Sequence, residues 1–207
     1  MSWLKEQVRL LGAFLRGDFR RTLLYCALGM VLAVLLGAGV GLLFPQRAYQ
    51  VLNDFMEQIA ESGVVNEAGE MSVFALLLNN WRAMLMSAAY GFIPFLFLPV
   101  LSLVINGVLL GMLAAIFAAN GTSPLVYLAG ILPHGIFELP ALVFSIACGV
   151  CLCRNMCRLV VSSPDRTPLP ELLEELLRVL VLVIAPLTAA AAFVECYVTP
   201  VVMGLFL

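Results

Sequence analysis

The sequence predicts an all-α fold: a polytopic transmembrane helical bundle of about five spans, with amphipathic helices at the membrane surface. Of the 207 residues, 63% are hydrophobic and 12% are charged, whereas soluble domains contain about 45–50% apolar and about 25% charged residues. Several uncharged stretches are long enough to cross a hydrocarbon core of about 30 Å. The charged residues gather between these stretches, which leaves no separate soluble domain.

The composition also excludes several classes of function. A formal net charge of −2 provides no basic surface, so we expect no nucleic-acid partner. His134 is the single histidine of the sequence, which excludes zinc hydrolase sites built from two or three imidazoles. Because no Ser–Lys or Ser–His arrangement is evident either, we expect neither enzymatic activity nor a cofactor.

Residues 1–21 are predicted to form a basic amphipathic helix on the cytoplasmic membrane surface. Five basic residues lie there among apolar residues whose spacing gathers them on one helical face. Residues 22–207 then form a single transmembrane domain, which begins with an uncharged span at 23–44. No cleavage motif follows this span, so it is predicted to be a retained anchor. Its outer end contains three closely spaced glycines that permit close helix packing: Gly37, Gly39 and Gly41.

An acidic segment at residues 45–82 is predicted to be an outer loop, because five acidic residues there oppose two arginines. From Arg82 to the next basic residue the chain is almost uncharged. Breaks near 99–107 and 120–124 divide this stretch into three predicted spans, near 83–103, 105–119 and 125–150. The middle one is short enough to be re-entrant, and two internal prolines predict that the last one is partly broken.

The segment 151–178 again contains charged residues, among them four arginines, and is predicted to be a cytoplasmic loop containing a second interfacial helix. The last span is predicted at 179–203, interrupted at Pro186. Basic residues number nine in the two predicted cytoplasmic segments and two in the outer loop. The positive-inside rule therefore predicts a multi-pass protein of the plasma membrane with a cytoplasmic N-terminus, in direct contact with membrane lipid.

Two glutamates lie inside predicted spans, Glu138 and Glu195. A charged side chain in hydrocarbon is costly, so each must face protein or water, pair with another group, or stay protonated. His134 precedes Glu138 by four residues and shares its helical face if the turn is regular. Two interpretations stay open: a buried hydrogen-bonded pair that fixes helix register, and a proton-linked or ligand-binding centre.

Four cysteines form a C-x2-C-x-C-x3-C pattern at the cytoplasmic end of the fourth predicted span. Helical phase would scatter their sulfurs around the helix axis, so we expect no metal site there. Cysteine is also a small apolar residue that packs well. We therefore expect the cluster to be dispensable.

Several short motifs resemble the stage II sporulation protein M family of polytopic membrane proteins. They are Asn79-Asn80, Asn106-Gly107 with Gly111, Pro133-His134-Gly135-x-x-Glu138 with Ala141 and Gly149, and Phe193-Val194-Glu195 followed by Thr199-Pro200. The resemblance runs from about residue 72 to 200. It implies a polar core formed by Asn79, Asn80, Asn106, Gly107, Pro133, His134, Gly135, Glu138 and Glu195.

The resemblance also implies a function. In spore formers the family member acts with stage II sporulation proteins D and P, which degrade peptidoglycan, and is regarded as the membrane scaffold of the engulfment machine. Our first hypothesis is therefore a membrane assembly protein whose outer loop docks cell-wall enzymes. The alternative is a small transporter or channel that uses His134, Glu138 and Glu195 as a relay. With so few other polar residues in the spans, such a pathway would require a homo-oligomer.

Overall fold

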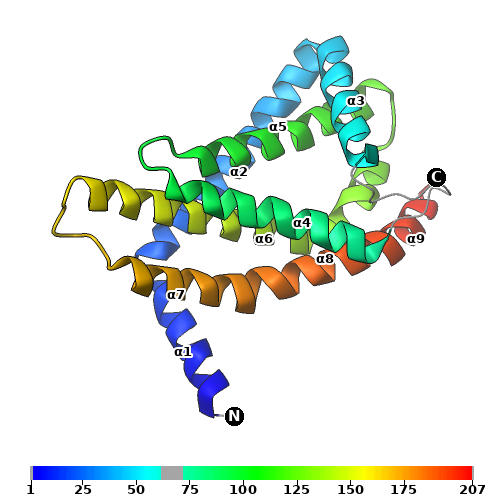
Figure 1. Cartoon of the computed structure of the whole chain (residues 1–207). Coiled ribbons are helices and arrows are strands. Elements are labelled where there is room, and N and C mark those ends of the chain that lie inside the picture. The colour runs from blue at the N-terminus through cyan, green and yellow to red at the C-terminus, as the bar shows by residue number, and fades with distance from the viewer. Residues whose placement is uncertain (1, 62–71, 207) are drawn as a thin grey trace.

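The structure, a computed structural model, describes residues 2–61 and 72–206, and the ordered elements in these ranges are all helical. This confirms the predicted all-α fold. The elements, in chain order (Figure 1), are α1 (Ser2–Arg16), α2 (Asp18–Leu43), α3 (Pro45–Glu61), α4 (Val73–Ala89), η1 (Tyr90–Phe92), α5 (Leu98–Ala119), α6 (Pro124–Val160), α7 (Leu169–Val179), η2 (Leu180–Ile184), α8 (Ala185–Tyr197) and α9 (Thr199–Gly204).

Within the described ranges, four helices are long and apolar enough to cross a membrane: Asp18–Leu43, Leu98–Ala119, Pro124–Val160 and Leu169–Tyr197. The shorter α4, of 17 residues, runs alongside α6 in Figure 1 and makes a further pass through the bundle. The multi-pass architecture agrees with the prediction, although several boundaries differ from it.

One end of the bundle, which we name the α1 end, contains α1, the turn 93–97 and the loop 161–168. The Cys153 thiol near the end of α6 donates a hydrogen bond to the Ile93 carbonyl oxygen (3.3 Å). The predicted basic segments, residues 1–21 and 151–178, meet near this end, where Arg178 donates a hydrogen bond to Gln7 of α1.

The opposite end, which we name the α3 end, contains α3, the turn 120–123 and α9. The Tyr49 hydroxyl of α3 donates a hydrogen bond to the Asn120 side chain. His134 of α6 likewise lies 3.2 Å from the Thr199 hydroxyl of α9. Helices α4 and α8 also meet here, through the buried residues Leu76 and Ala192.

The positive-inside rule predicts that the α1 end is cytoplasmic. A cysteine introduced at exposed Asp54 of α3 should react with a membrane-impermeant maleimide in intact cells, whereas one at exposed Asp165 should react only after permeabilisation. Both are compared in a background from which the native cysteines have been removed. The opposite labelling pattern would show that the predicted topology is wrong and that the α3 end is cytoplasmic.

The predicted boundary between the spans 83–103 and 105–119 is wrong, because α5 contains the whole second span but already begins at Leu98. With 22 residues, α5 is long enough to cross a membrane and is not a short re-entrant element. The chain instead breaks at 93–97, where Phe95 and Phe97 have positive φ angles. Pro99 lies in the first turn of α5, where a missing backbone N–H leaves no hydrogen bond unmade. Helix α4 begins much earlier than predicted, after Ser72 at its N-cap, whose hydroxyl accepts a hydrogen bond from the Ala75 N–H (3.3 Å).

The predicted outer loop 45–82 is therefore largely helical. It contains α3 and the first part of α4, and the intervening residues 62–71 lie outside the described ranges. The acidic composition of this segment led to its prediction as a loop, although its apolar residues have the spacing of an amphipathic helix. Arg82, assigned to the loop, lies in α4.

The predicted break in the helix 125–150 is also wrong, because α6 runs uninterrupted for 37 residues with Pro133 and Pro140 inside it. Prolines are tolerated within membrane helices because neighbouring groups and local adjustments satisfy the freed carbonyls. The helix also extends beyond residue 150 to Val160, so the predicted cytoplasmic loop 151–178 contains only a short non-helical connection.

A separate interfacial helix before a span at 179–203 is not observed. Helix α7 continues without a break through η2 into α8 as one 29-residue span. Its residues Leu172, Leu176 and Val179 are buried in the main core. The π-helical turn η2 ends just before Pro186, where it accommodates the missing backbone donor.

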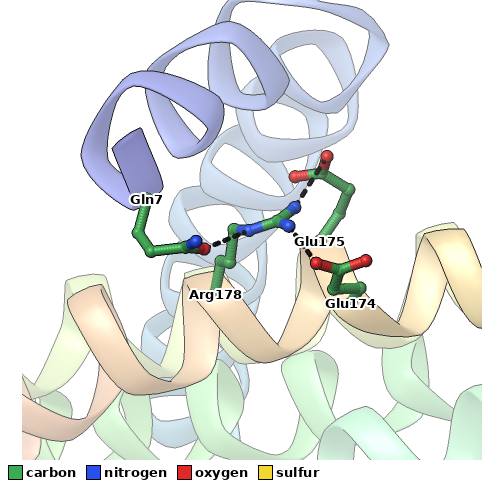
Figure 2. A network of polar contacts seen from close by, with 4 residues as sticks. All are labelled: Gln7, Glu174, Glu175 and Arg178. Atoms are coloured by element: carbon green, nitrogen blue, oxygen red, sulfur yellow. Dashed lines mark hydrogen bonds and ion pairs between the residues drawn. The ribbon is translucent and has the colours of Figure 1, made fainter. Parts of the chain in front are cut away.

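Helix α1 is attached to this span by a polar network at Arg178 (Figure 2). The Arg178 guanidinium donates to the Gln7 side-chain oxygen (2.8 Å) and pairs with Glu175 (2.9 Å) and Glu174. The Arg178 side chain is only 11% exposed. Charge-assisted hydrogen bonds of this kind are stronger than neutral ones, so the network fixes where α1 leaves the bundle.

Helices α2 and α5 pack at very close distance through paired glycines. Gly37 and Gly41 of α2 face α5, and Gly107 and Gly111 of α5 face α2. A Cβ atom at Gly111 would lie 2.0 Å from the Val34 carbonyl oxygen. Each helix thus contributes a G-x-x-x-G motif, which lets two membrane helices bring their backbones together.

Candidate functional site

The polar residues of the predicted core converge on a groove of about 720 Å³, which we name the polar groove. It is formed by α3, α4, α5, α6 and α8. Its polar lining consists of Gln58, Asn79, Asn80, Ser87, Ser102, Asn106, Glu138 and Glu195, and its apolar lining includes Phe55, Leu76, Met84, Ile105, Leu109 and Leu142. Glu138 is the fifteenth residue of α6, about 20 Å from its first residue at ~1.5 Å per residue.

Helical periodicity explains why these side chains meet. On α5, Ser102, Asn106 and Leu109 are spaced by four and three residues and share one face. The Asn106 amide donates to the Ser102 carbonyl oxygen (2.8 Å). On α4, Asn80 and Ser87 are seven residues apart and face the same groove.

Some polar groups of the groove are hydrogen-bonded to each other, whereas one buried polar group has no partner among the described residues. The Ser87 and Ser102 hydroxyls share a hydrogen bond (2.8 Å) that joins α4 to α5. The Asn80 Nδ2 atom, by contrast, is buried and has no hydrogen-bond partner among the described residues. Asn79 and Asn106 are exposed although they lie on apolar helices. The groove therefore offers free hydrogen-bonding capacity inside the bundle.

One wall of the groove continues into a compact group that we name the His–Glu cluster: His134, Glu138 and Glu195. One ligand atom from each lies within 4.8 Å of the others. His134 Nε2 is 3.9 Å from Glu138 Oε2, and its Nδ1 is 3.2 Å from the Thr199 hydroxyl. The cluster connects α6, α8 and α9.

Three residues of the predicted core lie elsewhere. Gly107 faces α2, where an added Cβ would lie 2.5 Å from the Ala33 Cβ, so it serves helix packing. Gly135 is buried within α6, with Ile131 3.4 Å from an added Cβ. Pro133 is half-buried in the same helix. None of the three lines the polar groove.

The sequence prediction missed four polar residues of the site: Gln58, Ser87, Ser102 and Thr199. Ser102 could have been found from its spacing of four residues before Asn106. Ser87 follows Asn80 by seven residues, a spacing that becomes a signal only once α4 is known to include Asn80, and its hydrogen-bond partner comes from the next helix. Thr199 was noted only as part of a motif, and its bond to His134 depends on how α9 folds back onto α6.

The cysteines do not converge. Cys148, Cys151 and Cys153 are buried, and Cys153 faces the 93–97 turn through its bond to Ile93. Cys157 accepts a hydrogen bond from the Phe95 N–H in the same turn (3.1 Å). Among the described residues, no three sulfurs come within metal-ligating distance of one another.

We expect replacement of Cys148, Cys151, Cys153 and Cys157 by alanine to leave abundance and function close to wild type. Alanine is preferred over serine because it places no unpaired hydroxyl in the buried positions. Abundance in the membrane and the metal content of the purified protein are the measurements. Stoichiometric zinc or iron that disappears in the quadruple variant would overturn the expectation.

Comparisons with known proteins place this architecture in a family. The family model described as stage II sporulation protein M matches residues 20–200. An uncharacterized protein of Methanocaldococcus jannaschii, MJ0793, is 29% identical over 126 residues, which cover 61% of this chain and 70% of that protein. No solved structure matches the chain. The chain belongs to the stage II sporulation protein M family.

Proposed function

We propose that this protein is a plasma-membrane assembly protein that holds a transmembrane helix of an envelope protein in the polar groove. The observation that carries the proposal is the exposure of Asn79 and Asn106 in a groove between apolar helices. Amide side chains within a membrane drive helix association, because hydrogen bonding across helices is favourable there. A partner helix with polar residues on one face would satisfy them.

The lining of the groove suits contact with one face of a helix. Its lining alternates amides with large apolar side chains such as Ile105 and Leu109. Apolar contact and a few interhelical hydrogen bonds are the interactions on which membrane helices associate.

Helix α3 would extend the docking surface beyond the membrane. Phe55 of α3 lines the groove, while Asp54 and Glu57 on the same helix are exposed. This replaces the predicted loop 45–82 as the docking element. A partner could thus contact α3 with its outer segment and the groove with its membrane anchor.

Family membership suggests a class of partner. Stage II sporulation protein M is regarded as a scaffold for peptidoglycan-degrading enzymes, stage II sporulation proteins D and P. We propose enzymes of that class as partners here, in sporulation engulfment or a related envelope process. The protein itself would have no enzymatic activity.

Affinity purification in a mild detergent tests the proposal. Peptidoglycan-remodelling enzymes should co-purify with the wild-type protein. The double substitution Asn79→Leu and Asn106→Leu removes two interhelical hydrogen bonds, each of about 0.6 kcal/mol, and should weaken partner binding by roughly eightfold. The matched control is Tyr25→Leu on α2, which is 73% exposed and outside the groove. Recovery that is unaffected by the double substitution would contradict the proposal.

A second candidate is a small oligomeric transporter or channel. It is favoured by the two carboxylates of Glu138 and Glu195 that line the groove. In the described ranges neither lies within 4.0 Å of a lysine or arginine nitrogen. Intramembrane carboxylates of this kind occur in ion and proton pathways. Recovery of a self-oligomer alone would favour this candidate.

A further inference from the structure

We propose that the His–Glu cluster binds a first-row divalent transition-metal ion. The cluster supplies one imidazole nitrogen and two carboxylates from two helices, with one ligand atom from each within 4.8 Å of the others. Three protein ligands leave coordination positions open, as in metal sites that also hold water or another ligand. The proposed assembly function does not require this site, whereas the second candidate, a transporter, would use the same three residues.

The geometry favours a shared ion over a direct contact. The distance of 3.9 Å from His134 Nε2 to Glu138 Oε2 is too long for a hydrogen bond. Two ligand atoms that each lie ~2.0–2.2 Å from one ion can be separated by up to roughly 4 Å. Small side-chain rotations would therefore suffice to bring all three ligands onto one ion.

The second ring nitrogen of His134 is held by a residue outside the cluster. Its Nδ1 lies 3.2 Å from the Thr199 hydroxyl oxygen. When Nδ1–H donates to that oxygen, Nε2 carries the free lone pair and faces the carboxylates. Metal-ligating histidines are usually oriented in this way by a hydrogen bond to the other nitrogen. Gly130 supports the arrangement, because Met203 of α9 packs against it at 3.2 Å from an added Cβ.

Charge also favours a bound cation. Both glutamates lie within long apolar helices, and in the described part of the chain His134 is the one basic side chain within 4.0 Å of either carboxylate. Two partly buried carboxylates without a cation repel each other and lose hydration. A divalent ion would balance both charges while the imidazole stays neutral.

The donor set indicates the class of ion. Imidazole suits zinc and iron, and carboxylate suits manganese, so one nitrogen with two oxygens fits first-row divalent ions such as Mn²⁺ or Zn²⁺. Mn²⁺ is the better probe, because it prefers oxygen ligands to thiolates, so that the six cysteines of the chain do not compete for it.

Titration of the full-length protein in detergent with Mn²⁺ tests the proposal. Binding is measured as the loss of the electron paramagnetic resonance signal of the free ion. We expect one ion per chain. Both His134→Asn and Glu195→Gln should weaken binding by more than tenfold, and Thr199→Val should weaken it by about tenfold through the lost orienting bond. Zn²⁺ should displace Mn²⁺ from the variant that lacks Cys148, Cys151, Cys153 and Cys157.

The matched control is Glu57→Gln, which removes an exposed carboxylate of α3 and should leave the affinity unchanged. Thr199→Val keeps all three ligands, so it still tests the site if a ligand variant does not fold. Absence of Mn²⁺ binding by the folded wild-type protein would overturn the proposal. Binding that Glu195→Gln and Thr199→Val leave unchanged would do so as well. Neither result bears on partner recovery, which tests the proposed function separately.

Discussion

Replacement of Gly37 by leucine is expected to abolish accumulation of the folded protein, whereas the same replacement at Gly39 should be tolerated. A Cβ at Gly37 would lie 2.2 Å from the Val108 carbonyl oxygen, while a Cβ at Gly39 meets nothing within 4 Å. The clash at Gly37 is with backbone, which cannot rotate away. Overpacking costs typically about 1–3 kcal/mol, and we expect at least the upper figure here.

Membrane abundance and thermal unfolding in detergent measure the difference. The two glycines lie two residues apart on one helix, so the pair controls for length, hydrophobicity and helix propensity. Gly111→Leu provides an independent test from the α5 side, since its Cβ would meet the Val34 carbonyl. Equal stability of the Gly37 and Gly39 variants would show that α2 and α5 do not pack as described.

Glu138→Gln is expected to be tolerated much better than Glu138→Ala. The amide keeps a polar group near His134 Nε2, which lies 3.9 Å from Glu138 Oε2, and removes the charge. Alanine leaves that partly buried nitrogen without this polar neighbour, and an unsatisfied buried polar group costs ~1–3 kcal/mol. Thermal unfolding with a chelator present measures the stability difference without a contribution from bound metal. Partner recovery measures function, and the glutamine variant should retain it.

The same substitution separates assembly from transport. An amide cannot exchange a proton, so a proton relay through Glu138 would fail in the glutamine variant even though the protein folds. Glu195→Gln gives a second reading at the other carboxylate. If glutamine variants at both positions are stable and abundant but do not replace the wild-type protein in a complementation assay, the transporter is favoured over the assembly protein.

Composition and charge were sufficient to predict the class of fold. The uncharged length of 23–44 predicted α2 because a membrane span has a strict length requirement. Other predicted helix boundaries were wrong at prolines, because proline can interrupt a helix but can also lie in its first turn or within a membrane helix. Pro99 was interpreted as a break but starts α5, and Pro133 and Pro140 were interpreted as breaks but lie within α6.

The candidate site was predictable in part. Glu138 and Glu195 stood out because charge is rare within spans, and spacing placed His134 beside Glu138. Their proximity to Glu195 could not be derived from spacing, since it depends on how α8 packs against α6. Gly107 illustrates the converse: a residue of the family motif that serves the α2–α5 contact instead of the groove.

Site-specific photo-crosslinking tests the central claim, that the polar groove holds a helix of an envelope protein. A benzophenone amino acid is placed at Ile105, which lines the groove and is 50% exposed, and at Leu35 of α2, which is 63% exposed and outside it. We predict a discrete adduct with a peptidoglycan-remodelling enzyme from Ile105 and none from Leu35. Adducts with only a second copy of this chain, or no adduct from Ile105, would contradict the account.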